Sequence, residues 1–282
     1  MTLQELLCQA ADLPSFPQLA LRVARETEHS DACAASIADL MAEDQGLSTR
    51  VLRLANSSFF GVPRRIDSLR EAIIILGLVN VRRLALAAST YSWFLSTGRG
   101  SRLPMALWSQ SVGVATVAAS LETQSPKVSE TDLFTAGILA DIGLSAMGAV
   151  APEPVDRVFQ LCRDELMALA RAEQEVFGFS HEQVGAELAT EWGFPDGVIT
   201  CIRYHHWPHR APDGEVAPYF LNLAAGLMSE TNQGLVALGH QDVILPEVLV
   251  ALGLETEHLE AARAGLQRAL SMPQGILGGL AA

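Results

Sequence analysis

The stretch that decides the fold is DQGLSTRVLRLANSSFFGVPRRIDSLREAIIILG, residues 44–77. Its apolar residues Leu47, Val51 and Leu54 recur at intervals of three and four, which predicts a helix with one apolar face that ends near Asn56. The glycine and proline of the following FFGVP segment forbid continuation of that helix. The first half of the stretch is therefore predicted to be a helix followed by a stop.

A second helix is predicted after the stop. Ser68 and Glu71 have the spacing of a capping box, in which a hydroxyl and a carboxylate satisfy free backbone N–H groups at a helix start. The apolar run Ala72–Leu76 predicts that this helix lies in the core, and Gly77 can end it. Helical spacing continues on both sides of the stretch without a strand pattern of convincing length, so the sequence predicts an all-α protein.

The composition is that of a chain with a large buried core. Of its 282 residues 49% are hydrophobic and 18% are charged, which excludes a disordered chain. The longest charge-free run, Leu103–Leu121, contains Ser109, Gln110 and Ser111, and the N-terminus lacks the basic segment of a signal peptide. The four cysteines form no CxxC pair. We therefore expect a cytoplasmic protein with no membrane contact and without a disulfide framework.

A short glycine-containing segment divides the chain. TGRGSR, residues 97–102, is typical of a linker, and Pro104 suits the first turn of the helix that follows. We therefore expect an N-terminal helical subdomain over residues 1–97 and a second helical bundle over residues 103–282. The alanine-rich helix predicted over Glu260–Leu270 could pack between protomers, so the sequence is compatible with a homo-oligomer.

Positive charge is concentrated in one part of the chain. Residues 45–102 hold nine arginines against two acids, a net charge of +7, whereas the whole chain carries −13. Because an acidic protein is repelled from a polyanion, nucleic acid is the disfavoured partner. We expect the arginines to pair with acids of the flanking segments or with an acidic partner protein. The candidates for partner contact are Arg64, Arg65, Arg82 and Arg83.

Two adjacent aromatic residues, Phe59 and Phe60, precede the stop in the deciding stretch. Such a pair could form an exposed patch for a partner helix, or it could fill the corner between two helices. We expect the second arrangement and keep both residues as candidates for partner contact.

Four residues have the chemistry of a metal site. Asp141, His181, His205 and His206 lie in predicted helices or near their ends, where the backbone could aim them inward. The capping box of Ser180 and Gln183 predicts the start of the helix that contains His181. The same spacing fits core histidines bonded to protein groups, or a pocket that receives a phosphate or carboxylate. These alternatives stay open at the level of the sequence.

Five segments occur in a distinctive order: LPSFPQLALRVARE, LSTRVLRLANSSFFGVPRRIDSLREAIIILGLVNVRRLAL, LWSQSVGVA, FTAGILADIG and FSHEQVGAELATEWGFPDGVITCIRYHHWP. Through them the sequence resembles, over roughly residues 13–210, the HDOD family of bacterial signalling proteins, which are related to HD-domain phosphohydrolases. The resemblance implies an N-terminal helical bundle packed on an HD-like helical bundle. It also implies a regulatory role without demonstrated catalysis, with a signalling protein as partner.

The resemblance to active HD phosphohydrolases is incomplete at the metal ligands. The first ligand His is replaced by Gln110, the His of the His-Asp doublet by Ala140, and the late Asp falls near Ala225. The segment after the paired histidines, HHWPHRAPDGEVAP, lacks the GYP sequence of cyclic-dinucleotide phosphodiesterases of the HD-GYP kind. Too few ligands remain to generate a metal-bound hydroxide.

We therefore expect a non-catalytic signalling protein that acts through protein contacts. It would have no catalytic residue, no cofactor-binding residue and no cofactor beyond a residual divalent metal ion. Its vestigial ligands would be Asp141, His181, His205 and His206. The alternative is a metal-dependent phosphohydrolase for nucleotides or cyclic dinucleotides with a rearranged metal site.

Overall fold

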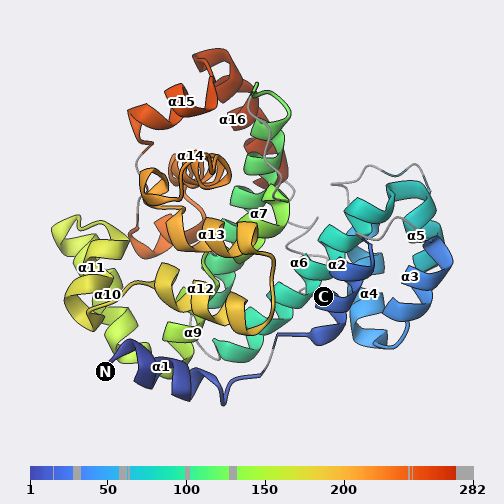
Figure 1. Ribbon diagram of the computed structural model, residues 1–282, viewed down its shortest axis with the longest axis horizontal. Helices are drawn as coiled ribbons and strands as arrows, with labels where there is room; N and C mark the ends of the chain where they lie inside the picture. The colour runs from blue at the N-terminus through green and yellow to red at the C-terminus, as the bar shows by residue number, and fades with distance from the viewer. Residues whose placement is uncertain are drawn as a thin grey trace. The chain divides into compact units, whose positions relative to one another are not determined.

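A computed structural model describes residues 1–14, 16–27, 33–56, 62, 64–98, 102–126, 132–240, 242 and 244–270 of the chain. Over these residues it contains helices and no strand, which confirms the predicted all-α class (Figure 1). The helices are α1 Leu3–Ala10, α2 Gln18–Glu26, α3 Ala34–Met41, α4 Gln45–Ala55, α5 Leu69–Leu76, α6 Leu78–Thr97, α7 Leu103–Glu122, α8 Leu133–Leu139, α9 Ile142–Val150, α10 Pro152–Glu165, α11 Leu169–Phe177, α12 His181–Glu191, α13 Asp196–Tyr204, α14 Ala217–Ser229, α15 Pro246–Leu252 and α16 Thr256–Leu270, with 3-10 turns η1 Pro208–Arg210 and η2 Gly234–Leu238.

The two helices predicted in the deciding stretch are α4 and α5. The α4 helix ends at Ala55, as the spacing predicts, with Asn56 as its C-cap. At the start of α5 the Ser68 hydroxyl accepts a hydrogen bond from the Glu71 backbone N–H at 3.1 Å. The Glu71 carboxylate reaches back one residue further than expected, to the backbone N–H of Asp67 at 3.0 Å.

Asn56 joins the end of α4 to the segment before α5. Its side-chain amide donates to the carbonyls of Leu52 and Ile66, both at 2.8 Å, and its Oδ1 accepts from the Ile66 N–H at 2.7 Å. Backbone N–H and C=O groups in a loop lack the hydrogen bonds that a helix provides, so a side chain that bonds to both groups of one residue satisfies them instead. The Asn56 amide therefore fixes where the chain re-enters the core after α4.

Asn56→Ala is expected to lower the free energy of unfolding by about 2 kcal/mol, because it removes three hydrogen bonds of about 0.5–1.5 kcal/mol each, offset in part by water. Urea-induced unfolding followed by circular dichroism measures this loss. Asn80→Ala is the control, since its amide, in the first turn of α6, donates to the Leu76 carbonyl only four residues earlier, at the end of α5. Equal losses in the two variants would contradict the bridging role of Asn56.

The expectation that all of Ala72–Leu76 lies in the core is wrong for part of the run. Ala72 and Ile73 are buried, but the side chain of Ile74 is 72% exposed and that of Ile75 is 39% exposed. A helix of eight residues buries only the positions that share one face. An apolar run longer than that face necessarily places some of its residues outside the core.

The α10 helix begins earlier than its prolines suggest. Pro152 and Pro154 interrupt the apolar pattern in the sequence, yet α10 starts at Pro152 and continues through both. Proline fits a first helical turn because the N–H groups there have no intrahelical partner. Leu166 then ends α10 in a left-handed conformation with φ 52°.

The chain separates into two compact units. One contains Met1–Pro14 and Phe94–Arg268, and the other is built around Ser15–Trp93, so the division falls inside α6. Compactness does not establish which segment folds alone, and the subdomains expected over residues 1–97 and 103–282 stay a prediction. The metal-ligand candidates all belong to the larger unit.

Small residues bring the central helices of the larger unit together. A Cβ added at Gly137 of α8 would lie 2.6 Å from the Ala115 Cα of α7, so these backbones are in direct contact. Within the described residues, Leu133–Val150 is the one stretch long and apolar enough to span a membrane by composition, and 83% of it is buried inside the unit. Such burial is typical of the core of a helical bundle.

Candidate metal centre

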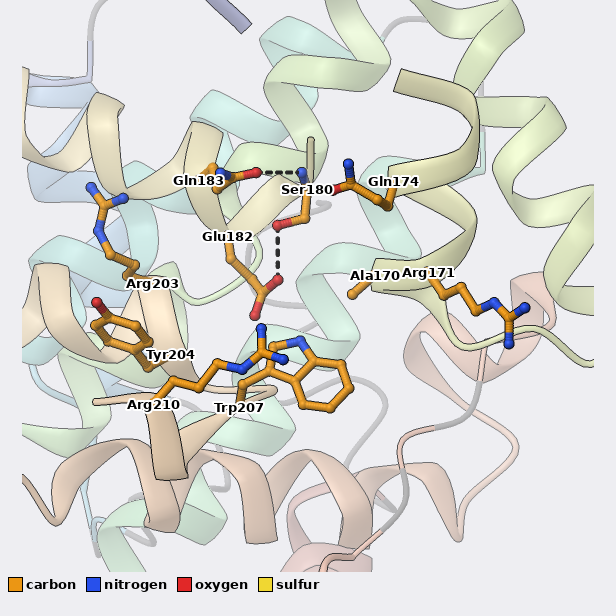
Figure 2. A pocket seen from close by; sticks show the side chains of 10 residues that line it. All are labelled: Ala170, Arg171, Gln174, Ser180, Glu182, Gln183, Arg203, Tyr204, Trp207 and Arg210. Carbon is orange, nitrogen blue, oxygen red and sulfur yellow. Dashed lines mark hydrogen bonds between the residues drawn. The ribbon is translucent and has the colours of Figure 1, made fainter. Parts of the chain in front are cut away.

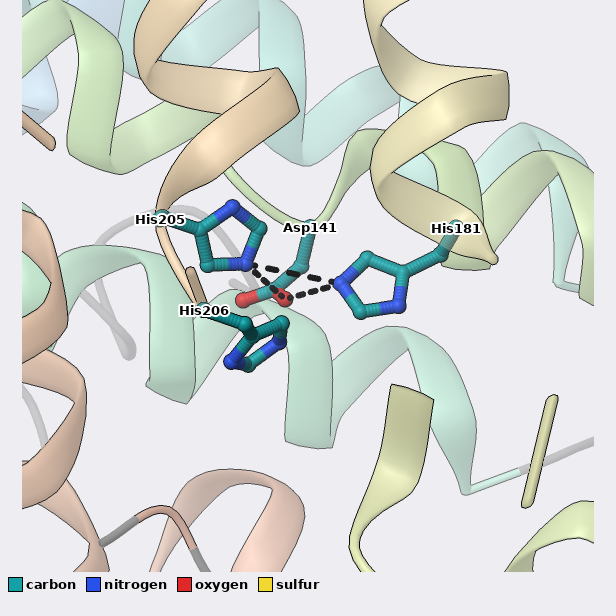
Figure 3. A group of neighbouring side chains, drawn as sticks. All are labelled: Asp141, His181, His205 and His206. Carbon is teal, nitrogen blue, oxygen red and sulfur yellow. Dashed lines mark hydrogen bonds and ion pairs between the residues drawn. The ribbon is translucent and has the colours of Figure 1, made fainter. Parts of the chain in front are cut away.

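Four side chains predicted from the sequence meet at one point in the larger unit (Figure 3). Asp141 lies at the junction of α8 and α9, His181 is the first residue of α12, and His205 and His206 follow α13. Each offers one ligand atom, and these atoms lie within 4.8 Å of one another. The exposed fractions of Asp141, His181 and His205 are only 3%, 0% and 2%.

Local sequence features place these side chains at helix ends. The Gln183 side chain accepts a hydrogen bond from the Ser180 N–H at 3.0 Å, which is the predicted capping box and fixes the start of α12 at His181. His205 is the C-cap residue of α13, and its ring Nδ1 donates to the Ile202 carbonyl of the last turn at 2.9 Å. Helix ends therefore set the backbone positions of the imidazoles.

The crossing of α9 and α12 depends on two glycines. A Cβ added at Gly143 would overlap the His181 carbonyl oxygen and the Gly185 N–H group, and one added at Gly185 would lie 2.9 Å from Ile202 Cγ2. Because the two backbones touch at Gly143, the start of α12 comes next to Asp141. This approach is what brings His181 within reach of the carboxylate.

Each of the three imidazoles is held through its Nδ1 atom. His181 Nδ1 lies 2.9 and 2.8 Å from the two carboxylate oxygens of Glu173, a fully buried residue of α11 that also accepts from the His181 backbone N–H at 3.0 Å. His205 Nδ1 is held by the Ile202 carbonyl. His206 Nδ1 lies 3.0 Å from Asp242 Oδ1. The Nε2 atoms thereby remain for the centre of the cluster.

The Nε2 atoms of His181 and His205 converge on Asp141. His181 Nε2 lies 3.4 Å from Asp141 Oδ1 and 3.4 Å from His205 Nε2, and His205 Nε2 lies 3.7 Å from the same oxygen. The Nε2 of His206 is buried and has no hydrogen-bond partner among the described residues. Lone pairs of three imidazoles and one carboxylate repel one another unless a cation lies between them.

The pKa values of Asp141 and His181 also favour positive charge beside the Asp141 carboxylate. Burial by itself raises the pKa of Asp141, but hydrogen bonds from His181 and His205 outweigh burial and lower that pKa below its usual value. Burial lowers the pKa of His181, whereas the Glu173 and Asp141 carboxylates raise it well above the ordinary value. The lowered pKa keeps the Asp141 carboxylate ionised, and a proton or a metal ion at the imidazoles would balance its charge.

The separations fit a tetrahedral metal site. Two nitrogens at about 2.0–2.1 Å from zinc and at the tetrahedral angle lie about 3.3 Å apart, and the two Nε2 atoms are 3.4 Å apart. A carboxylate or carbonyl on the second nitrogen of each imidazole is the usual support of a metal-bound histidine. The four residues thus have the ligand type, spacing and outer contacts of a metal centre.

Three supporting residues were missed by sequence reasoning. Glu173 and Asp242 hold His181 and His206, and the Asn222 side chain donates to the His205 carbonyl at 2.9 Å. The late Asp position of active relatives falls near Ala225 in the sequence, and a carboxylate from beyond η2, Asp242, contacts the cluster through His206. His240 joins it, with Nε2 3.1 Å from Asp242 Oδ2. The HxD spacing of His240 and Asp242 was the one signal that could have marked this segment.

The arginines predicted for partner contact lie at the surface or are half-buried, unlike the buried residues of the metal centre. Arg64 pairs with Glu71 at 2.6 Å and Arg65 with Asp67 at 3.1 Å, both within the deciding stretch, and both arginine side chains are exposed whereas Glu71 is half-buried. Arg82 and Arg83 are half-buried in α6. Phe59 and Phe60 lie outside the described residues. Surface ion pairs of this kind contribute about 0–1 kcal/mol each, so Arg64 and Arg65 remain available to an acidic partner.

A buried histidine and aspartate cluster at the ends of packed helices defines a helical bundle of the HD-like class. The HDOD domain matches residues 13–208, and the chain belongs to the HDOD domain family.

The individual relatives are more distant. An uncharacterized protein of Treponema pallidum (strain Nichols) is 26% identical over 219 residues, and the match spans 77% of this chain but only 42% of that protein. An HDOD domain protein of unknown function from Geobacter sulfurreducens superposes with a TM-score of 0.80 at 26% identity, covering 99% of this chain and 95% of that one.

Two further solved structures share the fold at lower identity. A provisionally assigned phosphohydrolase from Shewanella amazonensis SB2B gives a TM-score of 0.75 at 20% identity over 98% of this chain and 97% of the other. A provisionally assigned signal transduction protein from Marinobacter aquaeolei VT8 gives 0.76 at 24% identity over 96% of this chain and 60% of that one.

Proposed function

We propose that this HDOD protein is a non-catalytic signalling module whose larger unit is held together by one divalent metal ion. Asp141, His181, His205 and His206 would hold the ion, which would supply a cross-link between the α8–α9 junction, α12 and the end of α13. The observation that carries the proposal is the convergence of one carboxylate and imidazole Nε2 atoms whose Nδ1 atoms are already bonded. The sequence alone favoured no resident metal, and the geometry now favours one.

The same geometry supports the absence of hydrolysis. Structural zinc sites are closed by four protein ligands, whereas catalytic sites keep a position open for water. Here four protein ligands are available, and three of them are at most 3% exposed. Gln110 and Ala140 replace two ligands that active relatives of the bundle would use. Four protein ligands would leave a bound metal without an open position for a phosphodiester.

The output of such a module would be a protein contact. Arg64 and Arg65 lie on the surface of the basic stretch, and their short pairs with Glu71 and Asp67 could exchange for acids of a partner. This proposal rests on the charge and exposure of the two arginines. Affinity capture can identify the partner, as a protein that binds the wild-type chain and does not bind the Arg64→Glu variant.

Purified protein is expected to contain about one divalent metal ion per chain and to show no metal-dependent hydrolysis of bis(p-nitrophenyl) phosphate. Glu173→Gln is expected to weaken metal affinity by about 10–100-fold, because the carboxylate that orients His181 is lost. Mass spectrometry of metal content and competition with a chromogenic chelator measure both values. Glu175→Gln is the matched control, an exposed acid on the same helix.

Two results would count against the proposal separately. If the protein retains no metal after loading with zinc, manganese or iron, the proposed metal centre is ruled out. Hydrolysis that depends on the bound metal and is lost in Glu173→Gln but kept in Glu175→Gln would replace the signalling module with the phosphohydrolase alternative.

A further inference from the structure

The larger unit contains a second polar feature, a cavity of about 500 Å³ between α11, α12, α13 and η1 (Figure 2). None of the four residues of the metal centre lines it. Its volume lies within the range of small-molecule sites. The side chains that give it chemical character are Arg171, Arg203, Arg210, Glu182, Tyr204 and Trp207.

Positive charge gathers at this cavity in an otherwise acidic part of the chain. Residues 103–282 contain seven arginines, and three of them line the cavity. Arg203 is committed to Glu187 at 2.9 Å. Arg171 and Arg210 are exposed, and neither forms an ion pair with a described residue. Figure 2 shows the Arg210 guanidinium beside Glu182 and Trp207, whereas Arg171 extends away from them at the rim, so Arg210 is the guanidinium placed to meet an anion in the cavity.

Aromatic surface lies beside these charges. The Arg210 guanidinium carbon is 4.9 Å from the centre of the Trp207 ring, and Trp207 remains 37% exposed. Tyr204 stands on the neighbouring wall, at the end of α13 (Figure 2). Guanidinium planes and aromatic rings are surfaces on which a planar ligand stacks.

A buried acceptor faces the same space. Glu182 is 4% exposed, and its Oε2 accepts from the Ser180 hydroxyl at 2.8 Å. Its Oε1 is buried without a hydrogen-bond partner among the described residues. Figure 2 shows the carboxylate directed toward Trp207 and Arg210. A buried acceptor without a hydrogen-bond donor is energetically unfavourable, so an N–H or O–H group of a ligand that bonds to this oxygen would stabilise the complex.

We propose that this cavity binds a small anion with a planar, hydrogen-bond-donating ring, the chemistry of a nucleoside phosphate. Arg210 would contact the phosphate, Trp207 would contact the ring, and Glu182 Oε1 would accept from a ring N–H. An acidic peptide is the weaker fit, because the cavity is of small-molecule size and its single buried carboxylate would repel further carboxylates.

The test is isothermal titration of the full chain with GMP, guanosine and inorganic phosphate. GMP is expected to bind with a Kd below about 1 mM and at least about tenfold more tightly than guanosine or phosphate alone. Arg210→Gln is expected to weaken GMP binding about tenfold. Glu182→Gln is expected to weaken GMP binding while leaving the weak response to phosphate unchanged.

Arg157→Gln is the matched control, since Arg157 is an exposed arginine on α10 that bonds only Gln160 and does not line the cavity. The ligand proposal is overturned by the absence of GMP binding at millimolar concentration, by equal affinities of Arg210→Gln and Arg157→Gln, or by tighter binding of an oligoglutamate peptide. Metal content measured in the same samples separates this outcome from a failure of the metal centre.

Discussion

His181→Ala is expected to abolish stoichiometric metal binding and to lower the free energy of unfolding by about 3–5 kcal/mol. The variant removes one of four ligands, which costs the centre its closed coordination. It also leaves Glu173 buried at 0% exposure without the imidazole that its carboxylate holds. Metal analysis and chemical unfolding of the same preparation measure the two effects.

The double variant His181→Ala with Glu173→Gln separates the two causes. Neutralising Glu173 removes the unpaired buried charge, so part of the stability should return while the metal stays absent. If the stability of the double variant equals that of His181→Ala, the loss comes from the ligand alone. If His181→Ala retains metal at the wild-type stoichiometry, the centre assigned to Asp141, His205 and His206 is not built around this imidazole.

Gly143→Ala is expected to destabilise the larger unit by about 3 kcal/mol and to weaken metal binding at the same time. The added methyl group would overlap the His181 carbonyl oxygen and the Gly185 N–H group, both backbone atoms that cannot rotate away. The α9 and α12 helices must therefore separate, which draws His181 away from Asp141. Thermal unfolding and metal competition should both change.

Gly148→Ala is the control for this substitution. Gly148 lies on the same helix, but a methyl group there meets the flexible end of the Leu103 side chain. A side chain can adjust where a backbone cannot, so we expect a change below about 1 kcal/mol. Equal destabilisation by the two alanines would show that the loss reflects helix α9 in general and not its crossing with α12.

Local sequence signals predicted the helices that carry the site. The capping box of Ser180 and Gln183 predicted the start of α12, and the spacing of Leu47, Val51 and Leu54 predicted the end of α4. These signals succeed because their partners are three or four residues apart, and the geometry of a helix turn is the same in any protein.

The outer contacts of the metal centre had no comparable signal. Glu173 of α11 meets His181 at the start of α12, eight residues along the chain, and Asp242 meets His206 from beyond three intervening elements, η1, α14 and η2. Both acids look like ordinary surface charges in the sequence. Without them the three imidazoles would be a set of histidines with undefined orientation. The sequence favoured a vestigial site because Gln110 and Ala140 replace two ligand histidines of the active relatives.

The sequence by itself determined the helical class, the end of α4, the starts of α5 and α12 and the identity of the four central side chains, because each depends on local spacing or on a family pattern. Tertiary structure decided whether those side chains form a centre. Ligand geometry depends on the contact of α9 with α12 at Gly143 and on carboxylates that approach from distant segments. Such contacts are set by how helices pack, and helix packing has no fixed spacing along the chain.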